Sequence, residues 1–346
     1  MLFFTICANN YLARALVLGD SLKRNAPAAD FYIVLADKAA PSVDYSSLGH
    51  PILFIEQIEN KAGHLWSRYN TVELSTSIKP RAFQYFFAEK QADPVVFLDP
   101  DIAVYAKLDE VYRQLEQSDI LLTPHILQPI PYDGLTPWET PFHRVGIFNL
   151  GFLAVKRTEN TGRFLQWWKE RTYEFGYNRQ QEGLFTDQIF INHVPVFFEK
   201  VSILKHPGYN MAPWNLQERR LTRQDDGYLV NGTYPLVFFH FSTFDFGKIE
   251  LPWRKYDRFR IIDRPDLLPL YTQYNDWISE RGEEKLAGLP PAYEQFRLSQ
   301  QRRMERHHYR SKNIMQKIFW GSLGILPVKF KKKMIYFFNK DLERHK

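Results

Sequence analysis

The sequence of 346 residues contains a single cysteine, Cys7, and no long uninterrupted apolar segment. One cysteine excludes an internal disulfide and any zinc site built from several cysteines, and this scarcity is typical of a reducing compartment. A membrane-spanning helix needs about 18 apolar residues in succession, so none is expected. Residues 2–7 lack the basic and extended apolar regions of a signal peptide. We therefore expect a cytoplasmic protein.

The net charge of +6 is unevenly distributed along the chain. Residues 302–346 contain 13 Lys and Arg against 3 Asp and Glu, whereas the rest of the chain contains 32 against 36. The basic character belongs to the C-terminal tail and indicates little about the substrate of the main domain.

Hydrophobic residues make up 45% of the sequence, which is enough for a large core. Aromatic residues make up 16%. Most of these rings are expected to fill the core, although exposed rings could also stack on sugars or bases.

Apolar periodicity predicts strands that alternate with helices, the pattern of an α/β fold with a mostly parallel sheet. A polar and basic segment begins near residue 290. Strands are expected at 2–7, 31–35, 52–55, 95–98, 146–155, 197–204 and 236–241, and helices at 10–23, 79–90, 161–175 and from 186. Asn9 or Asn10 would cap the first helix, and Thr186 the last.

The stretch "VVFLDPDIAVY" (95–105) is the first candidate site, because an apolar strand ends there at Asp99 and Asp101. Ligands of α/β sheets bind outside the carboxyl ends of the strands. Two carboxylates on one loop can chelate a divalent cation that neutralises a diphosphate. A solvated turn is the structural alternative. A phosphatase of the haloacid dehalogenase type would carry Thr at the fifth position, where this chain has Ala103.

Five stretches, in this order, resemble the GT-A glycosyltransferases, most closely the retaining family 8 type. They are spread over most of the range 1–250: "TICANNYLARALVLGDSL" (5–22), "VVFLDPDIAVY" (95–105), "IFNLGFLAV" (147–155), "FTDQIFIN" (185–192) and "FFHFSTFDFGK" (238–248). The resemblance implies a GT-A domain over 1–289, with a Rossmann-like mixed, mostly parallel sheet flanked by helices, and a basic helical extension over 290–346. It also implies a metal-dependent enzyme that transfers a sugar from a nucleotide-diphosphate sugar, with retention.

The resemblance also implies roles for individual residues. Asp99, Asp101 and His240 would bind Mn²⁺ or Mg²⁺, and the imidazole ligand favours manganese. Asp187 and Gln188 would lie near the reacting sugar carbon and stabilise an oxocarbenium-like transition state. The nucleotide sugar would contact Ala8, Asn9, Asn10, Tyr11, Lys79, Arg81, Asp99, Pro100, Asp101, Asn149, Gly151 and Lys248.

Structural alternatives remain open for several of these positions. Asn9 and Asp187 could cap helices, His240 could be a hydrogen-bonded core histidine, and Lys248 a solvated loop residue. Asn149 and Gly151 could serve strand geometry, and Trp214, within "HPGYNMAPWNL" (206–216), could either pack in the core or bind sugar.

Two departures from the family pattern concern the donor. A UDP-sugar is the first expectation, but Ala8 stands where the family often carries an acidic residue that reads uracil. The late His segment is longer than the usual His-x-x-Gly-x-x-Lys, which weakens the role of Lys248 at the diphosphate.

The acceptor is expected to be a glycan or a lipid-linked glycan of surface polysaccharide biosynthesis, bound near the Pro-rich stretch 125–140. The tail mixes apolar residues with Lys329 and Lys331 to Lys333, which suits peripheral attachment to the anionic inner face of a membrane. A tail packed on the domain and a nucleic-acid patch are the alternatives, and we expect no nucleic-acid partner. The alternative function is a non-catalytic protein that binds carbohydrate or a nucleotide sugar.

Overall fold

The computed structural model describes residues 1–60, 62–225, 227–253 and 255–311, the last six as backbone only. Met1–Glu294 forms one compact unit. Beyond it the description comprises only the remainder of helix α12 (Ala292–Ser311). Most of the basic tail, including its lysine cluster, therefore lies outside the described residues, and its proposed attachment to a membrane stays a prediction.

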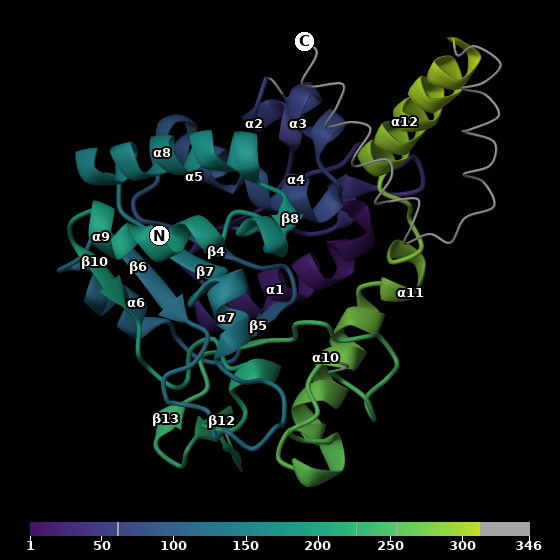
Figure 1. Ribbon diagram of the computed structural model, residues 1–346. Coiled ribbons are helices and arrows are strands. Elements are labelled where there is room, and N and C mark those ends of the chain that lie inside the picture. Colours follow the sequence, from purple (N-terminus) through teal and green to yellow (C-terminus); the bar gives the residue numbers. More distant parts are fainter. Residues whose placement is uncertain (61, 226, 254, 312–346) are drawn as a thin grey trace. The chain divides into compact units, whose positions relative to one another are not determined.

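The main unit is built on a seven-stranded sheet, counted over the described residues, in the order β10-β6-β7-β4-β1-β2-β3 (Figure 1). Only β7 runs against its neighbours β4 and β6, and the other pairs are parallel. The mixed, mostly parallel sheet predicted from the sequence is therefore confirmed. Its strands are β1 (Leu2–Cys7), β2 (Asp30–Leu35), β3 (Ile52–Phe54), β4 (Val95–Leu98), β6 (Ile120–Pro124), β7 (Phe148–Val155) and β10 (Val201–Ile203).

Helices cover both faces of the sheet, because successive side chains of each strand point to opposite sides. On one face Phe4 belongs to a core cluster with α5 (Lys79–Glu89) and α8 (Glu159–Phe175). On the other, Phe3 packs with α1 (Leu12–Asn25) and α6 (Asp109–Leu115). The continuous apolar runs of β1 and β4 follow from burial on both faces.

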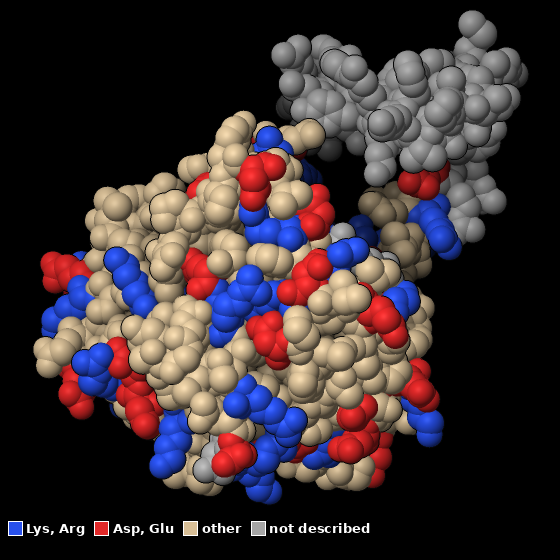
Figure 2. All heavy atoms as spheres, turned by 90° about the horizontal axis from the view of Figure 1, so that it is seen from below, with Lys and Arg blue, Asp and Glu red and all other residues tan. Residues whose placement is uncertain are grey.

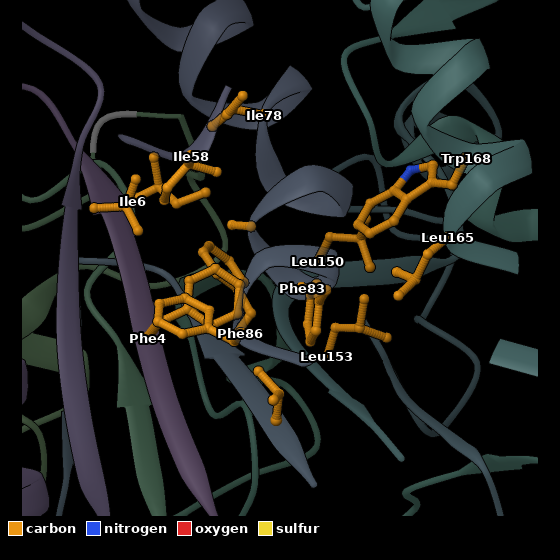
Figure 3. Packing of buried hydrophobic residues seen from close by; sticks show 14 of the residues in the cluster. Phe4, Ile6, Ile58, Ile78, Phe83, Phe86, Leu150, Leu153, Leu165 and Trp168 are labelled. Atoms are coloured by element: carbon orange, nitrogen blue, oxygen red, sulfur yellow. The ribbon is translucent and has the colours of Figure 1, made fainter. Parts of the chain in front are cut away.

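In the core under α5 and α8, the rings of Phe4, Phe83, Phe86 and Trp168 lie among aliphatic side chains (Figure 3). The ring centroid of Phe4 lies 4.9 Å from those of Phe83 and Phe86 and 5.2 Å from that of Phe97. Each fully buried Phe side chain contributes about 1.5–3 kcal/mol to the stability of the fold. Among the described residues, most aromatic side chains are buried in the core clusters or packed against them, as expected.

A second layer of short strands completes the unit. β5 (Ile102–Val104) pairs antiparallel with β14 (Phe238–His240), and β11 (Leu221–Gln224), β12 (Gly227–Val230) and β13 (Tyr234–Pro235) form a small sheet. Helix α10 (Leu268–Glu280) packs against this region in a further core cluster. The remaining elements are α2 (Ile55–Ile58), α3 (Ala62–Arg68), α4 (Thr71–Ser77), α7 (Thr140–Val145), α9 (Val194–Phe197), α11 (Glu283–Leu286), β8 (Asn178–Arg179), β9 (Leu184–Phe185) and the short 3₁₀ helices η1 (Asn9–Tyr11), η2 (Tyr45–Ser47), η3 (Gln180–Glu182), η4 (Ile189–His193), η5 (Pro213–Asn215) and η6 (Ile261–Asp263).

Three local predictions were wrong. The first helix is preceded by η1, so Tyr11 stands at the N-cap of α1, and Asn9 does not cap it. Thr186 has a φ of +46° and does not cap a helix, and the chain continues into η4. The segment expected as one strand from 197 to 204 begins at the end of α9, and only Val201–Ile203 pairs with β6.

Basic and acidic side chains are interspersed over the face shown in Figure 2. Among the described residues, no helix is both long and apolar enough to span a bilayer.

Candidate metal and donor site

The turn after β4 presents the two carboxylates. All four residues of β4 are buried, and the strand ends where the Asp99 amide donates to the Gly151 carbonyl at 2.8 Å. A tight turn follows, in which Ile102 N donates to Asp99 O at 3.1 Å. The Asp99 side chain is 31% exposed and that of Asp101 13%, so both reach the surface at the carboxyl end of the sheet.

His240 reaches the same point from a distant part of the chain. The β5–β14 register pairs His240 with Ile102, and the Phe241 amide donates to Asp101 O at 2.8 Å. His240 Nε2 lies 3.0 Å from Asp101 Oδ1 and 3.8 Å from Asp99 Oδ2. One ligand atom from each of the three residues lies within 4.8 Å of the others. The structure thus brings together the three residues expected to bind a metal.

The electrostatics of the cluster reflect two carboxylates held close together. Burial raises the pKa of Asp99 to about 6 and outweighs the opposing effects of Lys79 and His240. Burial also acts to raise the pKa of Asp101, but His240 and Arg14 outweigh it and the net pKa is lowered. Burial acts to lower the pKa of His240, but the two carboxylates raise it overall. Positive charge at this point is therefore strongly favoured.

The donor set fits a divalent cation. Two carboxylate oxygens and one imidazole nitrogen suit manganese better than magnesium, which prefers oxygen ligands alone. His240 Nδ1 is buried and has no hydrogen-bond partner among the described residues.

Gly151 and Trp214 both lie against the His240 ring. A Cβ at Gly151 would lie 2.6 Å from His240 Cε1 and 2.7 Å from Nδ1, so any larger residue would displace the ring. The Trp214 ring meets His240 edge-on with centroids 5.1 Å apart, and Trp214 is 4% exposed. Trp214 is thus a core residue, and it packs behind His240.

Lys79 and Asp187 form a buried ion pair beside the cluster. Lys79 Nζ lies 2.8 Å from Asp187 Oδ2, and each side chain is 2% exposed. The same Nζ donates to Leu150 O at 3.0 Å and lies 4.0 Å from the ring centroid of Phe97. Asp187 therefore does not cap a helix, and its partner Lys79 lies close enough to Asp99 to influence that carboxyl.

Gln188 and Asn149 are engaged with the backbone. Gln188 Oε1 accepts from Leu150 N at 2.9 Å, and its Nε2 donates to Val145 O at 2.6 Å. Asn149 Oδ1 accepts from Gly151 N at 3.2 Å, and its Nδ2 lies 3.4 Å from His125 Nε2. Both side chains thus fix the part of β7 that lies against His240.

The turn η1 lies at the end of β1, next to β4. Ala8 and Asn9 are buried, and the Asn9 amide group donates to Asp37 Oδ2 at 2.9 Å and to Lys38 O at 2.8 Å. Asn10 Oδ1 is buried and has no hydrogen-bond partner among the described residues. Tyr11 is 38% exposed. Asn9 therefore orders the turn, and Tyr11 presents its ring outward.

The remaining predicted contacts of the donor are Arg81, Lys248 and Pro100. Arg81 Nε lies 3.7 Å from Glu59 Oε2. The Lys248 side chain is 56% exposed and lies 3.4 Å from Asp245 Oδ2. Pro100 forms the turn between the two aspartates.

Two further residues around the site were not among the predicted site residues. His125 stacks on Phe142 and meets Trp214 edge-on, and burial lowers its pKa to about 4, so its imidazole is neutral. Arg14 is buried and paired with Glu283. Arg14 lies within the stretch 5–22 and His125 at the start of the stretch 125–140, but their partners Glu283 and Trp214 come from distant segments, so neither residue was predicted at the site.

Comparison with family models finds no match. Among curated proteins, the chain is 27% identical over 152 residues to the uncharacterized protein YfnF of Bacillus subtilis (strain 168), covering 44% of this chain and 50% of YfnF. It is 23% identical over 296 residues to the uncharacterized protein YfnD of the same organism, covering 80% of this chain and 90% of YfnD. The alignment thus spans half the length of YfnF.

Among solved structures, the chain is similar to three proteins described as glycosyltransferases. The galactosyltransferase LgtC, in complex with donor and acceptor sugar analogs, has a TM-score of 0.46 at 16% identity, over 80% of this chain and 95% of LgtC. The glycosyltransferase GlyE of Streptococcus pneumoniae TIGR4 has a TM-score of 0.46 at 14% identity, over 84% of this chain and 65% of GlyE. Mouse xyloside xylosyltransferase 1 has a TM-score of 0.42 at 15% identity, over 70% of this chain and 97% of the xylosyltransferase. At these values the function has to be argued from the site itself.

Proposed function

We propose that the protein is a metal-dependent glycosyltransferase that transfers a sugar from a nucleotide-diphosphate sugar, with retention. The observation that carries this proposal is the cluster of Asp99, Asp101 and His240 at the carboxyl end of the sheet. Its three ligand types suit Mn²⁺, and the resemblance of the surrounding segments to the GT-A family supports the assignment. A cation bound there would neutralise the charge that develops on a diphosphate leaving group.

The side chains around the cluster suggest how a donor would be held. The nucleoside would lie over η1 with Ala8, Asn9, Asn10 and Tyr11, because β1 is the neighbour of β4 in the sheet. The sugar would lie on the other side, against the Lys79–Asp187 pair and the strand segment fixed by Asn149 and Gln188. Arg81, Pro100 and Lys248 belong to the proposal as further donor contacts.

The Lys79–Asp187 pair gives the site a fixed charge distribution. A buried carboxylate whose position is set by a cation can stabilise positive charge that develops on the sugar ring. Asp187 would serve this role, and Gln188 would keep the adjacent β7 backbone in place through its two hydrogen bonds.

The acceptor would be a glycan or lipid-linked glycan of surface polysaccharide biosynthesis, bound near the stretch 125–140. In this stretch Tyr132 is fully exposed and Trp138 is 37% exposed, as expected of rings that stack on sugars. Arg258 orders the stretch by binding Asp133 and the carbonyl of Leu135.

Hydrolysis of nucleotide sugars tests the proposal without knowledge of the acceptor. We expect the full-length protein to hydrolyse one of the common UDP-, GDP-, dTDP-, ADP- or CDP-sugars slowly, with Mn²⁺ and not with EDTA. Asp101→Ala should abolish this activity and Mn²⁺ binding while the circular dichroism spectrum is unchanged. Hydrolysis by Asp101→Ala at the wild-type rate would refute the metal assignment, and nucleotide-sugar binding without turnover would favour the non-catalytic alternative.

A further inference from the structure

The segment 282–294, called the strap here, contacts two buried residues, Arg14 and Asp37, and each of these in turn contacts a residue of the turn η1. The first contact is near its start, where Glu283 Oε1 lies 2.8 Å from Arg14 Nε and the two side chains are 2% and 7% exposed. Helix α11 of the strap packs against η1 and α1. A buried, hydrogen-bonded ion pair fixes its two elements more firmly than a surface pair does.

Arg14 in turn contacts Tyr11. Its guanidinium carbon lies 4.8 Å from the ring centroid of Tyr11, within the range of a cation–π contact. Glu283 therefore fixes Arg14, and Arg14 supports the ring of Tyr11, which is 38% exposed. An aromatic ring that is held in this way and partly exposed is suited to stack on a flat ligand.

The second contact is at the end of the strap. Ala292 N donates to Asp37 Oδ1 at 2.8 Å, and the other oxygen of Asp37 accepts from Asn9 N at 3.3 Å and from Asn9 Nδ2 at 2.9 Å. Asp37 has no exposed surface. Asp37 thus joins the strap to the first residue of η1 and has no exposed surface with which to read a base.

The position of η1 indicates which ligand the strap would affect. The sheet order places the end of β1 between the ends of β4, which carries the metal cluster, and β2, which carries Asp37. Neighbouring strands lie about 4.8 Å apart, so a diphosphate at the cluster would direct its nucleoside over η1.

The ion pair between Glu283 and Arg14 is not optimised for stability. Arg14 Nη1 and Glu283 Oε2 are buried and have no hydrogen-bond partner among the described residues. Buried polar groups without a partner reduce stability. The pair is therefore better explained by the placement of Tyr11 than by a gain in stability.

We propose that the strap positions Asn9 and Tyr11 for the nucleoside of the donor, and that Glu283 and Asp37 are positioning residues that set nucleotide affinity. This inference rests on the proposed function, since it assumes a metal-bound nucleoside diphosphate. The ligand class is a Mn²⁺–nucleoside diphosphate, and the base selectivity would come from η1 and not from Asp37.

The test compares Glu283→Gln with Arg281→Gln in the full-length protein. Arg281 also forms an ion pair with α1, through Asp20, but that pair is partly exposed and, within the described residues, neither side chain forms a hydrogen bond with η1. Titration calorimetry with Mn²⁺ and UDP, GDP, dTDP, ADP or CDP identifies the nucleotide that binds the wild type. We expect Glu283→Gln to weaken its binding by about tenfold, since the acceptor of the hydrogen bond from Arg14 loses its negative charge. Affinity for Mn²⁺ alone should stay within about twofold.

A second variant tests the proposal in case Glu283→Gln does not fold. Ala292→Pro removes the N–H that Asp37 accepts, at the first residue of α12, where proline is tolerated. It should weaken nucleotide binding about threefold to tenfold, as expected for one hydrogen bond, while Arg281→Gln binds like the wild type. The positioning role of the strap is refuted if both strap variants bind the nucleotide with wild-type affinity, or if Arg281→Gln loses as much affinity as they do. Either result leaves the proposed function unaffected. If no nucleotide binds the wild type with Mn²⁺, the proposed function itself fails.

Discussion

The substitution Gly151→Ala tests how tightly the candidate metal site is built. The added Cβ would lie 2.6 Å from His240 Cε1 and 2.8 Å from Asn149 Oδ1. The movement of His240 is restricted, because the Trp214 ring packs against it and β14 is paired with β5. The backbone of Gly151 cannot retreat freely either, since its carbonyl accepts the hydrogen bond from Asp99.

The size of the effect follows from these distances. The imidazole must move by about 0.8 Å to reach an ordinary contact of 3.4 Å. Functional groups have to stay within about 0.5 Å of their productive positions, so the imidazole would leave the coordination sphere. Overpacking a buried position of this kind costs about 1–3 kcal/mol of unfolding free energy. Misplacement of one ligand should weaken Mn²⁺ binding by about tenfold to a hundredfold.

Two measurements separate these effects, and Gly162→Ala is the matched control. Gly162 lies in α8 with no atom within 4 Å of an added Cβ, so its replacement should stabilise the helix by about 0.5–1 kcal/mol. Urea unfolding with EDTA reports stability, and electron paramagnetic resonance of free Mn²⁺ reports binding. If Gly151→Ala matches the wild type in both measurements, the contact between Gly151 and His240 does not constrain the site.

Three other predictions use separate parts of the molecule. Lys79→Met leaves the buried Asp187 carboxylate without its cation and should lower the unfolding free energy by about 3–5 kcal/mol in urea titrations, whereas a loss below 1 kcal/mol would show that Asp187 finds another partner. Arg258→Ala removes the hydrogen bonds that order residues 130–138, so chymotrypsin should cut this stretch faster with the circular dichroism unchanged; an equal rate of cleavage would refute the ordering role. Burial raises the pKa of Cys7 well above the usual range, so at pH 8 iodoacetamide should modify the urea-unfolded protein and spare the native one, and rapid native labelling would contradict the buried position of β1.

The parts of the fold that the sequence predicted are those fixed by local patterns. Residues 95–98 form a strand because four apolar residues are followed at once by Asp99 and Pro100, and both faces of β4 are buried. α5 begins at Lys79 because proline fits the first turn of a helix. Each of these patterns lies within a few residues, so the strand or helix can be predicted without knowledge of the rest of the fold.

The errors and omissions arose where distant segments decide the outcome. Phe197 ends α9 although its neighbours are apolar and β-branched, because only Val201–Ile203 meets the edge of β6. The partners Lys79 and Asp187 are separated by more than a hundred residues, and nothing near either residue reveals the other. Tertiary contacts of this kind override local propensity, so the residues around a site are harder to predict than its ligands.

The role of residues 206–216 is likewise decided by tertiary contacts. Its aromatic and amide residues suggested a sugar-binding stretch, but the His240 amide donates to Met211 O at 2.8 Å and the Trp214 ring packs against the imidazole. Asn215 Nδ2 fixes the segment by donating to Asn210 O and to His125 O, both at 2.9 Å. β14 has only three residues and would hold His240 weakly by itself. A three-residue strand can place a metal ligand only when its surroundings are rigid, and the hydrogen bonds of 206–216 supply that rigidity.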